Sequence, residues 1–271
     1  MPYPNLEGKH AHDSLVSAED FVRYWVSQGR LPAELTAPTG VIMLWQRPLY
    51  ERVLRGDDVT AFSPTPRDQA RDTAFLGLHT FDATEGTVGV IGGFGIGAPA
   101  ATVVLESLAA LGVRHFVGVG TAGALRPGLE AGDVIVCSRA VRDEGVSHHY
   151  LPPGRWAEPS PALTDRLTAA LAAAGLDPAP GASWTVDAPY RETVVEAEHY
   201  AAEGAAVVEM EAAALYSVGQ VRGVDVASAF AVSDSLAGGE WVPNFAHGRL
   251  RNRLGRLVPA AVDALVAMAS G

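Results

Sequence analysis

Three acidic side chains stand at points where short apolar segments of the chain end. Glu209 and Glu211 close one such segment, and Asp234 closes the next one along the chain. Residues two apart on an extended chain point to the same side, so Glu209 and Glu211 are placed to accept hydrogen bonds from vicinal hydroxyls such as those of a ribose. Solvated acids at strand ends are an equally common interpretation of the same spacing.

The residues around these acids predict the elements that position them. An apolar run at 205–208, an Ala-rich run at 212–221 and a second apolar run at 226–232 indicate a strand, a helix and a strand. In open α/β sheets, ligands bind outside the carboxyl ends of the strands. We therefore expect the three carboxylates to meet at one edge of a sheet.

Two turns rich in small residues stand at other predicted strand ends. Residues 92–97 (GGFGIG) open a helix predicted from about 98 to 111, and residues 120–124 (GTAGA) follow a strand predicted over 113–119. Glycines at a helix N-terminus let the backbone approach an anion closely. The first turn lacks the GxGxxG spacing with a later acidic residue, so it gives little support to a dinucleotide site. Thr121 offers a hydroxyl in the second turn, although many such threonines only cap their own loop.

Other candidate residues carry weaker signals. Tyr190 and Arg191 follow a predicted strand at 183–186 and are placed to contact a flat ring, although a packing Tyr and a solvated Arg are somewhat commoner. Adjacent histidines at 148 and 149 share no face of a helix or strand and have no third ligand at a usual spacing, so we expect no metal. Cys137 lies in an apolar run and is expected to be a buried structural thiol.

Composition limits the classes of function. The 271 residues suffice for one large α/β domain, and the net charge of −11 argues against a general nucleic-acid binder. The N-terminus lacks an apolar core and no apolar stretch reaches membrane-spanning length, so we expect a cytoplasmic protein with no membrane partner. Residues 1–38 are expected to form an extension on the outside of the domain or at a subunit contact, and 39–271 a single domain with a mostly parallel, mixed sheet.

Four segments in order make the chain resemble the nucleoside phosphorylase superfamily, of the uridine phosphorylase and hexameric purine nucleoside phosphorylase type, over roughly residues 40–265. They are GFGIGAP at 93–99, VGTAGAL at 119–125 with GD at 132–133, VRDEGVSHHY at 141–150, and VVEMEAAALY at 207–216 with VSDSL at 232–236. The resemblance implies a three-layer α/β/α fold with a distorted central sheet. It also implies a homo-oligomer built of dimers whose active sites borrow residues from a neighbour.

The resemblance further implies cleavage of the N-glycosidic bond of a nucleoside, with phosphate as the acceptor and no cofactor. Glu209, Met210 and Glu211 match the segment that binds ribose. Asp234 matches the acid that protonates or hydrogen-bonds N7 of a purine, which favours a purine over a pyrimidine base. A positioned acid helps because the departing base carries negative charge in the transition state.

The remaining candidate site residues fall into four groups. Thr121 is expected at both the ribose and the phosphate. The base is expected to contact Phe94, Gly123, Tyr190 and Arg191, the phosphate Arg47 and Gly97, and the 5′-hydroxyl of a neighbouring subunit's ribose His10 or His12.

Departures from the family concern the arginines that bind phosphate. The family's early Gly-Asp-Pro-x-Arg loop is replaced by residues 46–50, with Tyr50 at the arginine; Gly118 stands at a second arginine position, and no arginine is found near Phe75, the third. Partly buried phosphate dianions need charge-assisted donors. Three alternatives stay open: a phosphorylase with a rebuilt phosphate site, a nucleosidase that uses water but lacks an early glutamate before Glu51, and a non-catalytic nucleoside-binding protein.

Overall fold

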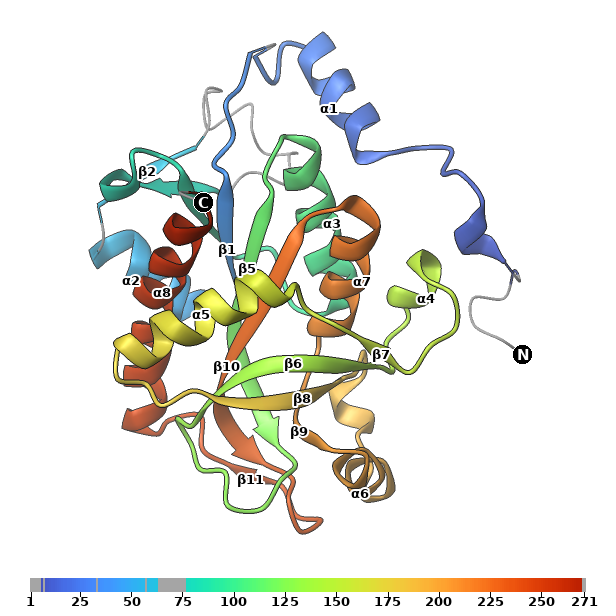
Figure 1. Ribbon diagram of the computed structural model, residues 1–271, viewed down its shortest axis with the longest axis vertical. Helices are drawn as coiled ribbons and strands as arrows, with labels where there is room; N and C mark the ends of the chain where they lie inside the picture. Colours follow the sequence, from blue (N-terminus) through green and yellow to red (C-terminus); the bar gives the residue numbers. More distant parts are fainter. Residues whose placement is uncertain (1–5, 7, 33, 57, 63–76, 270–271) are drawn as a thin grey trace.

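The computed structural model describes residues 6, 8–32, 34–56, 58–62 and 77–269, and shows a mixed sheet with helices on both faces (Figure 1). This confirms the predicted three-layer α/β/α architecture. The strands are β1 (Gly40–Leu44), β2 (Val59–Ala61), β3 (His79–Phe81), β4 (Val88–Gly92), β5 (His115–Ala124), β6 (Val134–Arg142), β7 (Trp156–Ala157), β8 (Ala179–Thr185), β9 (Ala205–Glu209), β10 (Asp225–Ser235) and β11 (Val242–Pro243).

Helices cover both faces of this sheet. The α-helices are α1 (Ala18–Ser27), α2 (Arg47–Gly56), α3 (Ala98–Ala110), α4 (Ser147–Tyr150), α5 (Pro161–Ala173), α6 (Val194–Ala202), α7 (Ala212–Arg222) and α8 (Gly248–Ala269), and short 3-10 turns are η1 (Lys9–Ala11), η3 (Asp82–Thr84) and η4 (Pro189–Arg191). The helices α5 and α8 pack together on one side of the sheet, and α3 and α7 pack together on the other (Figure 1).

Strand β5 organises the sheet because it pairs with three neighbours. It is parallel to β1 and β10 and antiparallel to β9. The path β5, β10, β6, β8, β9 then returns to β5, so this part of the sheet closes into a barrel-like ring. The pairs β10–β6 and β5–β9 are antiparallel, while β6–β8 and β8–β9 are parallel. The mixed, distorted sheet expected from the resemblance is confirmed.

Strand β1 shows why the continuous apolar run at 40–44 is a central strand. Every residue of β1 is buried, and successive side chains enter different parts of the core. Val41 and Met43 belong to the cluster that includes α3 and α7, while Ile42 and Leu44 belong to the cluster that includes α8. A strand covered on both faces is apolar throughout rather than alternating.

Two elements differ from the sequence predictions. Residues 132–136 alone predict a short strand, but β6 runs on to Arg142, because residues from Arg139 onward pair with β8. Helix α6 was not predicted, although its first turn carries a capping box in which Thr193 and Glu196 bond each other's backbone N–H. The T-x-x-E spacing was therefore an available signal.

The N-terminal segment lies along the outside of the α3 and α7 layer. Helix α1 packs on α3, and η1 packs on α4 (Figure 1). Its division from the rest of the chain as a separate unit stays a prediction. Within the described ranges, no helix has the length and apolar character needed to cross a membrane.

Candidate active site

A cavity of about 720 Å³ opens at the carboxyl ends of β5, β9 and β10. The acids Glu211 and Asp234 both line it, and Thr121 of β5 lies in the same wall. The remaining lining residues are mostly apolar or aromatic: Trp45, Gln46, Ile96, Ala122, Gly123, Pro189, Tyr190, Glu192, Val208, Glu209, Met210, Ser233, Leu236, Trp241 and Phe245. Such an apolar cavity with a few polar groups is typical of a small-molecule site.

Asp234 reaches the cavity through an irregularity in β10. The register with β5 shifts between Val232 and Asp234, so Asp234 lies opposite Gly123. Such bulges re-aim side chains at strand ends. The Ser233 hydroxyl donates to Asp234 Oδ1 at 2.6 Å, and the indole N–H of Trp241 donates to Oδ2 at 2.8 Å. Both oxygens of Asp234 therefore already accept a hydrogen bond.

Glu211 stands in the turn between β9 and α7, as the N-cap residue of the helix. Its Oε1 accepts from the backbone N–H of Gly97 at 2.5 Å. Gly97 has φ 90°, a left-handed conformation that favours glycine. Burial, together with the charge of Glu209, raises the pKa of Glu211 to about 8. This turn thus presents a carboxyl group that holds a proton near neutral pH.

Glu209 differs from Glu211 in what its oxygens contact. Its Oε2 accepts from the backbone N–H groups of Glu211 and Ala212, both at 2.7 Å. Its Oε1 accepts from the hydroxyls of Ser183 at 3.1 Å and Thr185 at 2.5 Å. The two-residue spacing assumed an extended chain, but β9 ends at Glu209 and the chain then turns into a helix, so the two side chains bond different elements although both line the cavity. Glu209 caps α7 and has no oxygen left free for a ligand hydroxyl.

The ring of Trp45 packs against the glycines that precede Thr121 on β5. A Cβ placed on Gly118 would lie 2.8 Å from Trp45 Cη2, so the ring covers this glycine closely. The ring also meets Phe94 edge-on, with centroids 6.3 Å apart. Phe94 therefore packs on Trp45 and is not among the residues that line the cavity.

The amide of Gln46 lies beside Thr121. Its Nε2 donates to Thr121 Oγ1 at 3.0 Å. Its Oε1 is buried and has no partner within the described ranges. Buried polar atoms are rarely left without a partner, so this oxygen is a candidate to accept a hydrogen bond from a ligand or water.

Comparison with known proteins identifies the family of this chain. The model of the phosphorylase superfamily matches residues 53–265. The chain belongs to the phosphorylase superfamily. The resemblance inferred from the four sequence segments is thereby confirmed.

Individual relatives of this superfamily match over part of their length. The chain is 33% identical over 158 residues to a uridine phosphorylase of Haemophilus influenzae, covering 58% of this chain and 60% of that protein. It is 29% identical over 155 residues to a guanosine phosphorylase of Halorubrum lacusprofundi, covering 57% and 64%. The matched part thus spans less than two thirds of these curated relatives.

Solved structures confirm the superfamily fold. A purine nucleoside phosphorylase from Toxoplasma gondii in complex with immucillin-H has a TM-score of 0.72 at 22% identity, covering 86% of this chain and 92% of that chain. An AMP nucleosidase from Bacteroides thetaiotaomicron has a TM-score of 0.69 at 20% identity, covering 94% and 98%. At these identities the likeness establishes the fold alone.

Aromatic side chains occupy the space near the two described positions where the superfamily resemblance places phosphate arginines. Beside Gly118 the space is filled by Trp45. Tyr50 is buried, and its hydroxyl contacts the Gly77 carbonyl and His79 Nδ1. Burial raises the pKa of Tyr50 to about 12, so this hydroxyl stays neutral. The third position, near Phe75, lies outside the described residues.

The other residues predicted to bind phosphate differ in whether they reach the cavity. The Arg47 side chain is 80% exposed, pairs with Glu51 at 2.8 Å and does not line the cavity, so the structure contradicts its expected place. The Gly97 N–H is already used by Glu211, which contradicts its expected role as a free donor. Thr121 does line the cavity.

A smaller cavity of about 430 Å³ adjoins the first and shares Gln46, Thr121 and Phe245 with it. Arg52, Arg55 and Arg251 are among its lining residues. The guanidinium groups nearest to Thr121 along this wall therefore come from α2 and α8. No pattern in the sequence singled out Arg251.

Some of the residues predicted to contact the base line the cavity, and others do not. Tyr190 and Gly123 line the cavity, while Arg191 does not. Sequence reasoning missed Glu192, which lines the cavity and has a pKa raised to about 7 by burial and by the charges of Asp234 and Glu196. It also missed the role of Trp241, whose contact with Asp234 depends on a loop that no periodicity describes.

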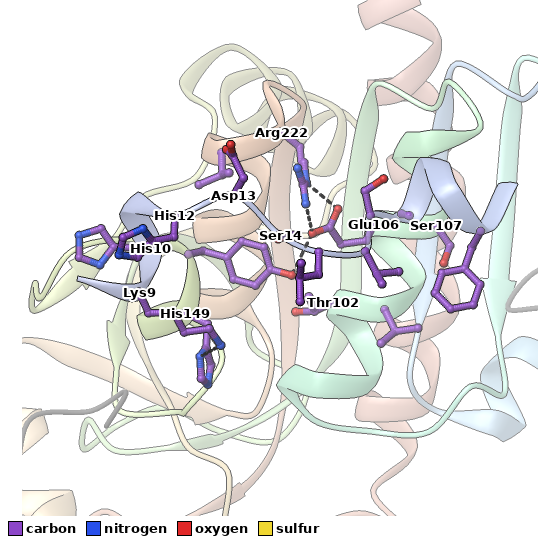
Figure 2. A pocket seen from close by; sticks show the side chains of 18 of the residues that line it. Lys9, His10, His12, Asp13, Ser14, Thr102, Glu106, Ser107, His149 and Arg222 are labelled. Atoms are coloured by element: carbon purple, nitrogen blue, oxygen red, sulfur yellow. Dashed lines mark hydrogen bonds and ion pairs between the residues drawn. The ribbon is translucent and has the colours of Figure 1, made fainter. Parts of the chain in front are cut away.

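The two N-terminal histidines lie elsewhere. His10 and His12 line a separate cavity of about 850 Å³ on the outer side of α3 and α4 (Figure 2). Beside them, Arg222 forms an ion pair with Glu106 at 2.6 Å. Neither histidine lines the active-site cavity of its own chain. Among the described residues, no group of three His, Cys, Asp or Glu side chains is placed to hold a metal ion.

Proposed function

We propose that this protein cleaves the N-glycosidic bond of a purine nucleoside and transfers the pentose to inorganic phosphate, giving free base and pentose 1-phosphate. The observation that carries the proposal is a single cavity with Glu211 and Asp234 in its walls and Tyr190 and Trp241 beside them. Relatives named uridine and guanosine phosphorylase support it. The reaction needs no cofactor.

The sugar is proposed to bind at Glu211. The carboxyl group of Glu211 is held at a fixed angle by the Gly97 N–H and keeps its second oxygen for the 2′- and 3′-hydroxyls. Met210 lines the same wall and supplies an apolar surface for the pentose ring. A hydrogen bond to a neutral carboxyl group contributes about 0.5–1.5 kcal/mol.

The base is proposed to bind at Asp234. Breaking the bond through an oxocarbenium-like transition state leaves negative charge on the base, and an acid or hydrogen-bond donor at N7 of a purine offsets that charge. Gly123 lies opposite Asp234, and the side chains of Leu236 and Val208 pack closely against it, so they bound the cavity beside Asp234 with an apolar wall for the base.

Phosphate is proposed to bind near Thr121. The adjoining cavity brings Arg52, Arg55 and Arg251 to the same wall, where guanidinium groups can supply charge-assisted hydrogen bonds. They would take the place of the arginines that the superfamily resemblance leads us to expect at residues 50 and 118.

Water is a second candidate acceptor, and Trp45 is the observation that favours it. Its ring covers Gly118 where a phosphate arginine would stand, and the free Gln46 Oε1 is placed to accept a hydrogen bond from water but not from a fully ionised phosphate oxygen. A nucleosidase would then release free pentose.

A homodimer is proposed to form through the N-terminal face. Leu15 is fully exposed, and Phe21 and Val103 are 52% and 59% exposed on the same surface. Grouped apolar side chains of this kind mark interaction sites. Multi-angle light scattering of the wild type and a Phe21→Ser variant tests this; a monomeric wild type contradicts it.

Product analysis on a panel of nucleosides tests the proposed function. Base release that requires phosphate and yields a pentose 1-phosphate is the expected result. Base release in phosphate-free buffer with free pentose assigns the second candidate. No base release from any nucleoside contradicts both candidates. The variant Glu198→Gln, which changes an exposed glutamate outside the cavity, should give the same products as the wild type.

A further inference from the structure

The base end of the cavity holds two carboxyl groups in different surroundings. Asp234 accepts hydrogen bonds at both oxygens, from the Ser233 hydroxyl and the Trp241 indole. Glu192 follows η4, lines the same cavity and is half-buried. In contrast to Asp234, it accepts no hydrogen bond within the part of the chain that the structure describes.

The groups around Glu192 all disfavour its charged form. Asp234 acts on it from β10 and Glu196 from α6, and no cation of the described residues is among the groups that shift its pKa. Glu196 is itself engaged in the capping box with Thr193, at 2.6 Å to the hydroxyl and 3.1 Å to the backbone N–H. Neighbouring Arg191 has an exposed side chain outside the cavity lining. Burial with these charges raises the pKa of Glu192 to about 7.

Two nearby carboxyl groups whose environments separate their protonation mark an acid and its charged partner. We propose that Glu192 is the proton donor to the leaving base, and that Asp234, whose two oxygens already accept hydrogen bonds, keeps the proton on Glu192 and orients the base. This inference rests on the proposed glycosidic cleavage and assigns its proton. It does not depend on whether phosphate or water accepts the sugar.

The same bonds break and form at the base whether phosphate or water is the acceptor. The electron pair of the C1′–N bond moves onto the purine, the Glu192 O–H proton moves to a ring nitrogen of the base, and Glu192 becomes a carboxylate. An oxygen of the acceptor bonds to C1′. The proton that the acceptor gives up passes through solvent and returns Glu192 to its acid form.

Leaving-group dependence tests this role. The variant Glu192→Gln keeps the size of the side chain but has no transferable proton. We expect its kcat to fall about 100-fold or more on an ordinary purine nucleoside. A 7-methylated purine nucleoside, whose cationic ring leaves without a proton, is expected to be cleaved by the variant within about twofold of the wild type. Glu198→Gln, exposed on the neighbouring helix α6, is the matched control and should change neither rate.

The pH dependence gives a second measurement. For the wild type, kcat/KM on the ordinary nucleoside should fall as pH rises through about 7, and this step should be absent in Glu192→Gln. Glu211, across the cavity with its pKa at about 8, should leave a separate step in both proteins. Carbon-13 NMR of the labelled glutamate carboxyls should show a titration near pH 7 that disappears in the variant.

Three results would overturn the inference. Equal loss on both nucleosides would mean that Glu192 only supports the structure, and no loss on either would mean that it carries no proton. A carboxyl titration near pH 7 that persists in Glu192→Gln would assign the proton to another group. Absence of cleavage of either nucleoside by the wild type would instead reject the proposed function itself, and the inference with it.

Discussion

The carboxylate side of the cavity and its acceptor side differ in how far they keep the features implied by the superfamily. On the carboxylate side, Glu211 and Asp234 stand at the ends of β9 and β10 as expected. On the acceptor side, aromatic rings of Trp45 and Tyr50 fill space near the positions expected to carry arginines. The chain thus keeps the residues that the resemblance implies for the nucleoside more closely than those it implies for the attacking acceptor, so substrate and acceptor must be tested separately.

The largest expected effect concerns the carboxylate side. Asp234→Asn removes the charge that faces Glu192 and the base, and we expect kcat on purine nucleosides to fall about 10²- to 10⁴-fold with a small change in binding. Steady-state kinetics and equilibrium binding of the nucleoside measure the two quantities. Unchanged turnover would remove Asp234 from the reaction.

A substitution at Gly118 tests how tightly the acceptor side is packed. In Gly118→Arg, the new Cβ would lie 2.8 Å from Trp45 and 3.0 Å from Ser228 Oγ, so overpacking should lower the free energy of unfolding by about 1–3 kcal/mol or more. Urea denaturation measures it.

The double variant Trp45→Gly/Gly118→Arg tests whether the Trp45 ring causes that loss of stability. It removes the clashing ring, so it should be more stable than Gly118→Arg and should gain affinity for phosphate. A single variant as stable as the wild type would show that Trp45 does not fill this space.

A smaller effect is expected from Glu211→Gln. Weaker hydrogen bonds to the ribose should raise KM for nucleosides about 10-fold. The pKa of Glu211 is raised to about 8 from its ordinary value of 4.5, so the folded state binds this proton more tightly and the wild type loses stability as pH rises from 4.5 to 8. The variant's melting temperature relative to wild type should therefore be higher at pH 8.5 than at about pH 5. Equal differences at both pH values would contradict the buried, protonated Glu211.

The smallest effect is expected from Arg47→Ala. Arg47 is exposed and paired only with Glu51, and such surface pairs contribute about 0–1 kcal/mol. Phosphate dependence and kcat should stay within about twofold of the wild type. A large loss of phosphate affinity would restore the arginine to the acceptor site.

The sequence indicated most of the layers and part of the site. An apolar run predicted β9, a glycine-rich turn predicted the start of α3, and acids at strand ends predicted Glu211 and Asp234. The same two-residue periodicity failed for Glu209, because it holds only while a strand continues. Local patterns describe one element at a time.

Local sequence patterns could not predict the contacts between segments that lie far apart in the sequence. Trp45 meets Gly118 because the register of β1 and β5 pairs Met43 with Gly118. Glu192 becomes half-buried only when its turn lies against the end of β10. Both features depend on how strands far apart in sequence are brought together, which a single sequence does not specify.

The structure of this protein with a non-cleavable purine nucleoside analogue is the most direct test of the site. We expect the 2′- and 3′-hydroxyls within hydrogen-bond distance of Glu211, and the five-membered edge of the purine at Asp234 with Glu192 beside it. An analogue bound in the reverse direction, or in a different cavity, would contradict it.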